Sequence, residues 1–169
     1  MRGPMLVSFR PCGPKDFKAL LRLTTAYYRF DKIPYDLPSL KRGLETLLRN
    51  PSQGQAWLLE THHKAIGYAL LTYNFDLEYG GIEGMLTDLY VDKHYRNRGV
   101  GSLALYELED FCRERGIRAI ELQVLNRNKA AETFYRKAGF RVLPRKVMVF
   151  DVPPQEQPGP RAVTAGKRR

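Results

Sequence analysis

A basic, glycine-containing loop is the part of the sequence best suited to chemistry. The loop follows an apolar, strand-like segment, 85–91, and precedes a long helical pattern. It consists of Arg96, Asn97, Arg98, Gly99, Val100, Gly101 and Ser102. Glycines let successive backbone N–H groups turn toward one ligand, and the following helix adds the positive end of its dipole. The pattern predicts a pyrophosphate site, while a plain strand-to-helix turn with exposed arginines explains the glycine spacing alone equally well.

A second motif follows the loop and gives it a context. This motif contains Val124, Asn128, Ala131, Tyr135 and the pair Gly139–Phe140. The two motifs in this order resemble the GNAT superfamily of N-acetyltransferases, whose cofactor motif is Gln or Arg, two residues, Gly, one residue, then Gly or Ala. Arg96, Gly99 and Gly101 fill that pattern. The resemblance covers roughly residues 7–149 and is strongest over 88–140.

The resemblance implies that acetyl-CoA is the acetyl donor. Where the fourth and fifth strands diverge, unpaired backbone groups can bind an extended amide ligand such as the pantetheine arm. The loop amides are expected to hold the pyrophosphate, with arginines beside them. The implied cofactor contacts are the main chain of Leu89, Tyr90 and Val91, the segment from Arg96 to Ser102, and the side chains of Asn128 and Tyr135.

Acyl transfer to an amine requires a neutral amine, a stabilised oxyanion and a proton for the departing thiolate. By resemblance, Tyr135 is the acid that supplies this proton, and the backbone N–H of Leu89 stabilises the oxyanion. The alternative for Tyr135 is a buried aromatic side chain in a helix beside Phe134.

The general base has two candidates, Asp88 and Glu83. Some relatives carry a glutamate just before the equivalent of Leu89, but Thr87 and Met85 occupy those slots here. Strand alternation turns Asp88 to the face opposite Thr87 unless a bulge intervenes, and Glu83 could act through a water. Both carboxylates could equally be structural or face solvent. No base is needed if the amine arrives unprotonated.

Aromatic residues and a carboxylate in the first helical region and after the third strand suggest an acceptor site for a cationic amine. Ordinary packing of amphipathic elements explains them as well. The acceptor would be a small amine, a polyamine-like or lysine-like compound, or a protein amine. The candidate residues are Tyr27, Tyr28, Tyr35, Tyr73, Phe75 and Glu78.

The expected fold is a mixed α/β (α+β) GNAT-like fold. Its sheet is mostly antiparallel, has six to seven strands, is splayed between strands 4 and 5, and is flanked by about four helices. Apolar stripes predict helices after Pro14 and Pro38, after the glycine loop, and over 128–137. Strands are predicted near 7–10, 56–59, 65–73, 85–91 and 120–124, and two last strands over 140–142 and 147–149.

The chain has 169 residues and a net charge of +10. The length suits one domain, 1–152, followed by a proline-rich and basic tail, 153–169, that is expected to be disordered. The charge suits a phosphate-binding pocket and equally a nucleic-acid-binding module, which is the first alternative function. However, the bases are spread along the chain, so no specific nucleic acid is expected. A second alternative is a relative that binds acetyl-CoA but has weak activity.

The two cysteines, Cys12 and Cys112, lack paired metal-ligand spacing, and no metal site is expected. The sequence has neither a segment of about twenty apolar residues nor a secretory signal pattern. A cytoplasmic protein without a membrane partner is therefore expected. A second copy of the chain, in a homodimer, could complete the acceptor pocket.

Overall fold

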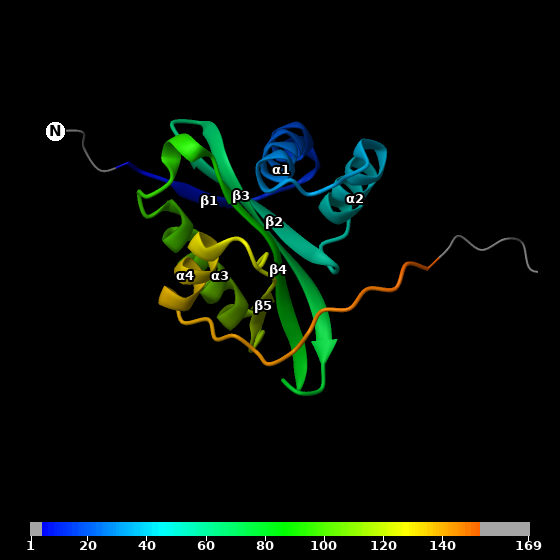
Figure 1. The fold of residues 1–169 in the computed structure, drawn as a ribbon. Helices are drawn as coiled ribbons and strands as arrows, with labels where there is room; N and C mark the ends of the chain where they lie inside the picture. The colour runs from blue at the N-terminus through cyan, green and yellow to red at the C-terminus, as the bar shows by residue number, and fades with distance from the viewer. Residues whose placement is uncertain (1–4, 153–169) are drawn as a thin grey trace, which may run out of the picture.

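A computed structural model describes residues 5–152 and shows one sheet between two layers of helices (Figure 1). The elements are β1 (Ser8–Pro11), a 3-10 turn (Pro14–Asp16), α1 (Phe17–Asp31), α2 (Leu37–Arg49), β2 (Gly54–Thr61), β3 (Lys64–Asp76), β4 (Gly81–Val91), a second 3-10 turn (Lys93–Tyr95), α3 (Val100–Glu114), β5 (Ile120–Leu122) and α4 (Lys129–Lys137). Within this part of the chain, no helix is long and apolar enough to cross a membrane. The predicted tail, 153–169, lies outside the described residues.

The sheet formed by residues 5–152 has the order β1-β2-β3-β4-β5, and the only parallel pair among these strands is β4 with β5. These two strands pair only from Gly84, opposite Ile120, to Leu86, opposite Leu122. Beyond this point β4 continues to Val91 without β5 beside it. The predicted divergence of the fourth and fifth strands is therefore present, and it leaves one edge of β4 open.

Local capping explains where the helices over the sheet begin and end. The Asp36 side chain accepts a hydrogen bond from the Ser39 amide, 2.9 Å, and starts α2 with a proline in its first turn. Asn128 caps α4 in the same way by accepting from the Ala131 amide, 3.1 Å. Helix α1 stops where Lys32 adopts a left-handed conformation, φ 55°.

Each face of the sheet has its own apolar core. Helices α1 and α2 bury Leu20, Leu23 and Leu44 against Leu58 and Tyr68 on one face. On the opposite face α3 packs with residues of β2, β3 and β4, and aromatic residues of α4 pack on the edge of this core. Figure 1 shows α1 and α2 on one side of the sheet and α3 and α4 on the other. A side chain on β4 therefore faces either the α1–α2 layer or the α3–α4 layer.

A bulge in β4 decides which layer its last residues face. Leu86 pairs with Leu71, and Asp88 pairs with Leu70, so Thr87 is an extra residue on β4. The Thr87 hydroxyl donates to the Leu70 carbonyl, 3.1 Å. Because of this residue, Asp88 lies on the same face as Leu70 and Tyr68, which is the α1–α2 face.

The prediction of two last strands over 140–142 and 147–149 is wrong. Among the described residues the sheet has five strands, and residues 140–152 form no strand. Figure 1 shows this segment crossing toward the turn between β3 and β4, where Arg145 forms an ion pair with Glu78. It forms no strand pairing with the outer edge of β5. Its apolar residues remain exposed, Met148 by 90% and Phe150 by 85%.

Two glycine substitutions test the packing of this fold. A Cβ on Gly67 would lie 2.4 Å from the Tyr90 carbonyl oxygen and 2.9 Å from Leu59 Cδ1, whereas a Cβ on Gly43 in α2 would contact nothing within 4 Å. We expect Gly67→Ala to lower the free energy of unfolding by about 1–3 kcal/mol or more. Gly43→Ala should raise it by about 0.5–1 kcal/mol through helix propensity. Urea unfolding measures both, and equal stability of the two variants would contradict the packing.

Candidate active site

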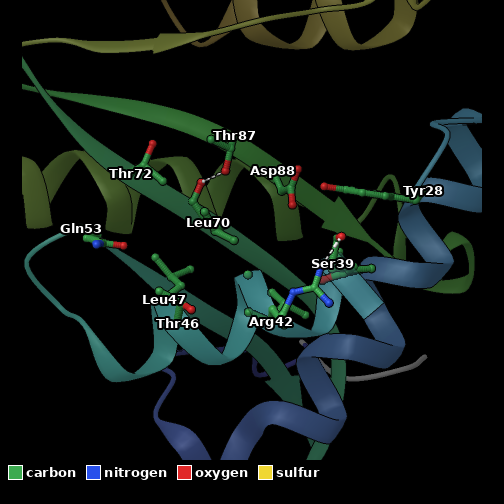
Figure 2. Close-up of a pocket in the computed structure, with 14 residues that line it drawn as sticks. Tyr28, Ser39, Arg42, Thr46, Leu47, Gln53, Leu70, Thr72, Thr87 and Asp88 are labelled. Carbon is green, nitrogen blue, oxygen red and sulfur yellow. Dashed lines mark hydrogen bonds between the residues drawn. The ribbon is translucent and has the colours of Figure 1, made fainter. Parts of the chain in front are cut away.

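A cavity of about 610 Å³ opens between α1, α2 and the β3–β4 pair. Its floor on the sheet includes Leu70, Thr72, Thr87 and Asp88. Figure 2 shows the Tyr28 side chain entering from α1 with its hydroxyl directed toward Asp88. The cavity therefore combines a mostly apolar lining with a carboxylate on its floor, which is typical of small-molecule sites.

Asp88 is the buried acid of this cavity, only 8% exposed. Its Oδ2 accepts a hydrogen bond from the Tyr68 hydroxyl, 2.9 Å. Burial disfavours the charged form and raises the pKa of Asp88 to about 6, while the Tyr68 hydrogen bond partly opposes this shift. A carboxyl group with a pKa near 6 is ionised at neutral pH and can still accept a proton readily.

The charge of Asp88 acts on four tyrosines. Burial raises the pKa of Tyr27, Tyr28, Tyr68 and Tyr135, and the negative charge of Asp88 raises each of them further. The pKa is about 12 for both Tyr28 and Tyr135. All four hydroxyls therefore keep their protons at neutral pH. They can serve as hydrogen-bond donors, or as acids toward a more basic group.

Tyr135 reaches this group from the opposite layer of the fold. It lies on α4, where its ring packs against Phe134 and Phe140 at centroid distances of 5.1 and 5.5 Å. The charge of Asp88 is nevertheless the second cause of its raised pKa, after burial. Since β5 does not continue beside the end of β4, the two residues can interact past the open edge of the sheet.

The backbone at this open edge alternates in direction. The Asp92 amide donates to the Ile66 carbonyl of the β3 strand, 2.8 Å, so the main-chain groups of Tyr90 also point toward β3. Those of Leu89 and Val91 point away from β3 and into the gap. Of the three residues predicted to bind pantetheine through the main chain, Leu89 and Val91 are thus directed at the gap and Tyr90 is not.

The glycine loop ends at the start of α3, as predicted. Gly99 has a left-handed conformation, φ 79°, and a Cβ there would have no neighbour within 4 Å, so the backbone is open to approach. The first helical hydrogen bond runs from the Leu103 amide to the Gly99 carbonyl, 2.9 Å. The amides of 100–102 precede this bond and have no carbonyl one turn earlier to accept them. The geometry suits an anion with several oxygen atoms.

Individual residues of the loop have distinct roles. The Arg96 Nε atom donates to the Val91 carbonyl, 2.8 Å, and its guanidinium lies 4.0 Å from the ring centre of Phe30. Arg96 therefore fixes the loop against α1, whereas Arg98 is exposed. A Cβ on Gly101 would lie 3.1 Å from the ring of Phe134, so this glycine permits close packing of α3 on α4.

The loops that flank the gap are also tied to α1. Arg127 precedes α4 and donates to the Asp31 carbonyl at the end of α1. The next residue, Asn128, uses its side-chain oxygen as the helix cap, which leaves its NH₂ group as the free donor. The end of α1 thus contacts both the loop after β4 and the loop after β5.

Several predicted site residues lie away from the cavity. Tyr73 packs in the core of the α3 face, Phe75 is 73% exposed near the end of β3, and Glu78 pairs with Arg145. Glu83 is buried near the start of β4, where its Oε1 accepts from Asn74, 3.3 Å, and burial raises its pKa. The cavity lining includes none of these four. Tyr35 is in edge contact with Tyr28, at a centroid distance of 5.7 Å.

Sequence reasoning missed three polar residues of this region. Tyr68 was interpreted only as part of an apolar strand, and Ser39 and Arg42 of α2 were not singled out because the stripe of leucines identified that helix. For Ser39 a sequence signal existed, because Asp36 three residues earlier is a typical helix cap and places Ser39 in the first turn of α2. Arg42 carries no comparable sequence signal.

Comparison with known proteins assigns the chain to a family. The model of the acetyltransferase (GNAT) family matches residues 17–140. This chain belongs to the GNAT family. Since the family members are acetyl-CoA-dependent acyltransferases, acetyl-CoA is the acetyl donor. The family assignment favours the pyrophosphate interpretation of the glycine loop over a nucleic-acid-binding module.

Relatives of this GNAT chain are distant. The uncharacterised N-acetyltransferase YycN of Bacillus subtilis is 27% identical over 152 residues, which cover 81% of this chain and 94% of YycN. A thialysine N-epsilon-acetyltransferase of Bos taurus is 30% identical over 74 residues, 44% of this chain and 43% of that enzyme. The chain spans about half the length, 43–51%, of several curated relatives that it matches.

A solved structure has the same fold. The integron cassette protein HFX_CASS3, from the mobile metagenome of Cole Harbour Salt Marsh, is 27% identical and covers 87% of this chain and 91% of that chain, with a TM-score of 0.76. The GNAT fold of this chain is therefore the one predicted, apart from the number of strands.

Burial of Asp88 predicts a pH dependence of stability. Because its pKa in the folded protein is raised from 3.8 to about 6, its contribution to stability is fully present below pH 3.8 and is lost as the pH rises through 6. The loss should be on the order of 1–3 kcal/mol. In Asp88→Asn, which keeps an acceptor for Tyr68, this loss should vanish. Urea unfolding from pH 4 to 8 measures it, and parallel curves for the two proteins would contradict the burial of a titrating Asp88.

Proposed function

We propose that this enzyme transfers an acetyl group from acetyl-CoA to a primary amine that enters the cavity, with Asp88 as the base and Tyr135 as the acid. The observation that carries this proposal is the Asp88 carboxylate. It lies on the cavity floor, and its charge raises the pKa of Tyr135, which lies across the open edge of β4. The bulge at Thr87 supplies the orientation that a regular strand would not give.

The proposed proton transfers follow from the environments of the two groups. A cationic amine in the cavity is attracted to the Asp88 carboxylate, and Asp88 accepts one proton from it, which frees the nitrogen lone pair for attack. Tyr135 keeps its proton because burial and the Asp88 charge raise its pKa to about 12. Its hydroxyl then donates that proton to the departing thiolate sulfur, and the resulting tyrosinate takes up the second proton that the acylated nitrogen loses.

The chain offers a matching set of groups for the acetyl donor. Acetyl-CoA, when bound, supplies an acyl group activated as a thioester. The main chain of Leu89 and Val91 would hold the pantetheine arm, and the amides from Asn97 to Ser102, with Arg98, would hold the pyrophosphate. The free NH₂ group of Asn128 would lie near the thioester. The Leu89 amide is directed into the gap and is the proposed donor to the oxyanion.

A small amine with a lysine-like side chain is the acceptor class that we propose. The carboxylate of Asp88 and the ring of Tyr28, the one aromatic residue of the described lining, favour a cation. The name of the bovine relative, thialysine N-epsilon-acetyltransferase, indicates a lysine-like acceptor for that protein.

An amine panel with free coenzyme A as the readout tests the reaction, and the absence of thiol release with every amine would contradict it.

The pH profile of kcat/KM tests Asp88 as the base. We expect the wild-type value to rise with pH and level off above about 6, where Asp88 is ionised. Tyr68→Phe removes a hydrogen bond that lowers the Asp88 pKa, so the midpoint should move up by about one pH unit. Asp88→Asn should lower kcat/KM about 100-fold or more. Tyr106→Phe, at an exposed position of α3, is the control and should keep the wild-type midpoint. An unchanged midpoint in Tyr68→Phe would exclude Asp88 as the general base.

Turnover of Tyr135→Phe tests the acid. The substitution keeps the ring that packs on Phe134 and Phe140 but removes the proton donor. We expect kcat to fall about 100-fold, while the Kd for coenzyme A measured by calorimetry changes less than about threefold. A parallel loss of coenzyme A affinity would instead assign Tyr135 to binding.

A further inference from the structure

The cavity is lined by two charged residues of opposite sign. Among its described lining residues, Asp88 is the one acid and Arg42 the one base. Asp88 lies on the floor formed by β4, and Arg42 belongs to α2 on the other wall; Figure 2 shows both, with Ser39 beside Arg42. A ligand that spans the cavity therefore meets a negative group at one end and a positive group at the other.

The Arg42 guanidinium has hydrogen-bonding capacity to spare. One of its amino groups donates to the Ser39 hydroxyl, 2.7 Å, and a guanidinium has five N–H donors in all. Asp36 is near enough for the Arg42 charge to lower its pKa slightly, but the main cause of that shift is hydrogen bonding with Ser39. Within residues 5–152, no ion pair with Arg42 is recorded.

These charges discriminate between kinds of amine. A diamine or polyamine that places one nitrogen at Asp88 would bring a second cation toward Arg42, which is electrostatically unfavourable. An amine that also bears a carboxylate would place an anion there, where a guanidinium and a hydroxyl can both donate to it. An amine that bears a carboxylate can therefore interact favourably with both Asp88 and Arg42, whereas a diamine or polyamine interacts favourably only with Asp88.

We infer that the acceptor is a small zwitterionic amine that carries a carboxylate, and that Arg42 selects it against polycationic amines. The inference rests on the proposed N-acetyl transfer and gives that site a substrate class. Arg42 is a specificity residue and takes no part in the proton transfers. Since its side chain is exposed, solvent screens the interaction, and the expected discrimination is about tenfold.

Matched pairs of amines test the inference. Lysine and cadaverine differ only by the carboxylate, as do ornithine and putrescine. For the wild type we expect kcat/KM, measured by release of free coenzyme A, to be about tenfold higher for the amino acid of each pair. Arg42→Gln should reduce this preference to about threefold or less. Arg49→Gln removes an exposed base from the same helix outside the cavity lining and should keep the full preference.

Calorimetry separates failure of the inference from failure of the proposed function. Lysine and cadaverine are titrated into wild type and Arg42→Gln in the presence of coenzyme A, which cannot transfer an acetyl group. Preferential binding of lysine that depends on Arg42, without release of coenzyme A for any amine in the kinetic assay, would support Arg42 as the residue that selects the carboxylate and would overturn the proposed function. Transfer to cadaverine equal to or faster than transfer to lysine would overturn the inference alone. A preference that persists in Arg42→Gln would also overturn it.

Discussion

Keeping a carboxylate out of water at Asp88 is the constraint on which the site depends. An ionised group buried to this degree is unfavourable unless a donor faces it, and the Tyr68 hydroxyl supplies that hydrogen bond. The charge of Asp88 in turn raises the pKa of Tyr27, Tyr28 and Tyr135. These four tyrosines come from α1, β3 and α4, so elements from both layers must be in place together. The same burial gives the acid a pKa suited to accepting a proton near neutral pH.

The short pairing of β4 with β5 connects this carboxylate to the rest of the site. Three residue pairs hold the strands together at one end, and beyond Leu86 the edge of β4 is open. That opening lets Asp88 on one face interact with Tyr135 from the other. It also leaves exposed the main-chain groups of Leu89 and Val91 that point away from β3, next to the start of α3. Asp88, Tyr135 and the loop at the start of α3 are thus neighbours because one pair of strands separates.

Patterns that depend on local chemistry could be predicted from the sequence. Helices α1 to α4 follow from their apolar stripes, and Gly99 marks the start of α3 because of its left-handed backbone. The direction of Asp88 could not be decided, since the bulge depends on how Leu70 and Leu71 of β3 pair with it. The strands predicted around Val142 and Val147 were wrong because alternation indicates an extended chain but does not show that the chain pairs with a neighbouring strand. Arg42 was missed because its importance arises only from the cavity that it lines.

The extra residue at Thr87 also determines where strand β4 can lose a residue without reorienting its side chains. Leu86 and Asp88 pair with the adjacent residues Leu71 and Leu70, so removing Thr87 would leave a regular strand in which every later side chain keeps its partner on β3 and its layer. Asp88 would still face the α1–α2 layer, and the Thr87 hydrogen bond to the Leu70 carbonyl would be lost. Removing a regularly paired residue such as Leu89 would instead turn Tyr90 and Val91 to the opposite layers. In-frame deletions in β4 should therefore be less damaging at Thr87 than at the positions that follow it.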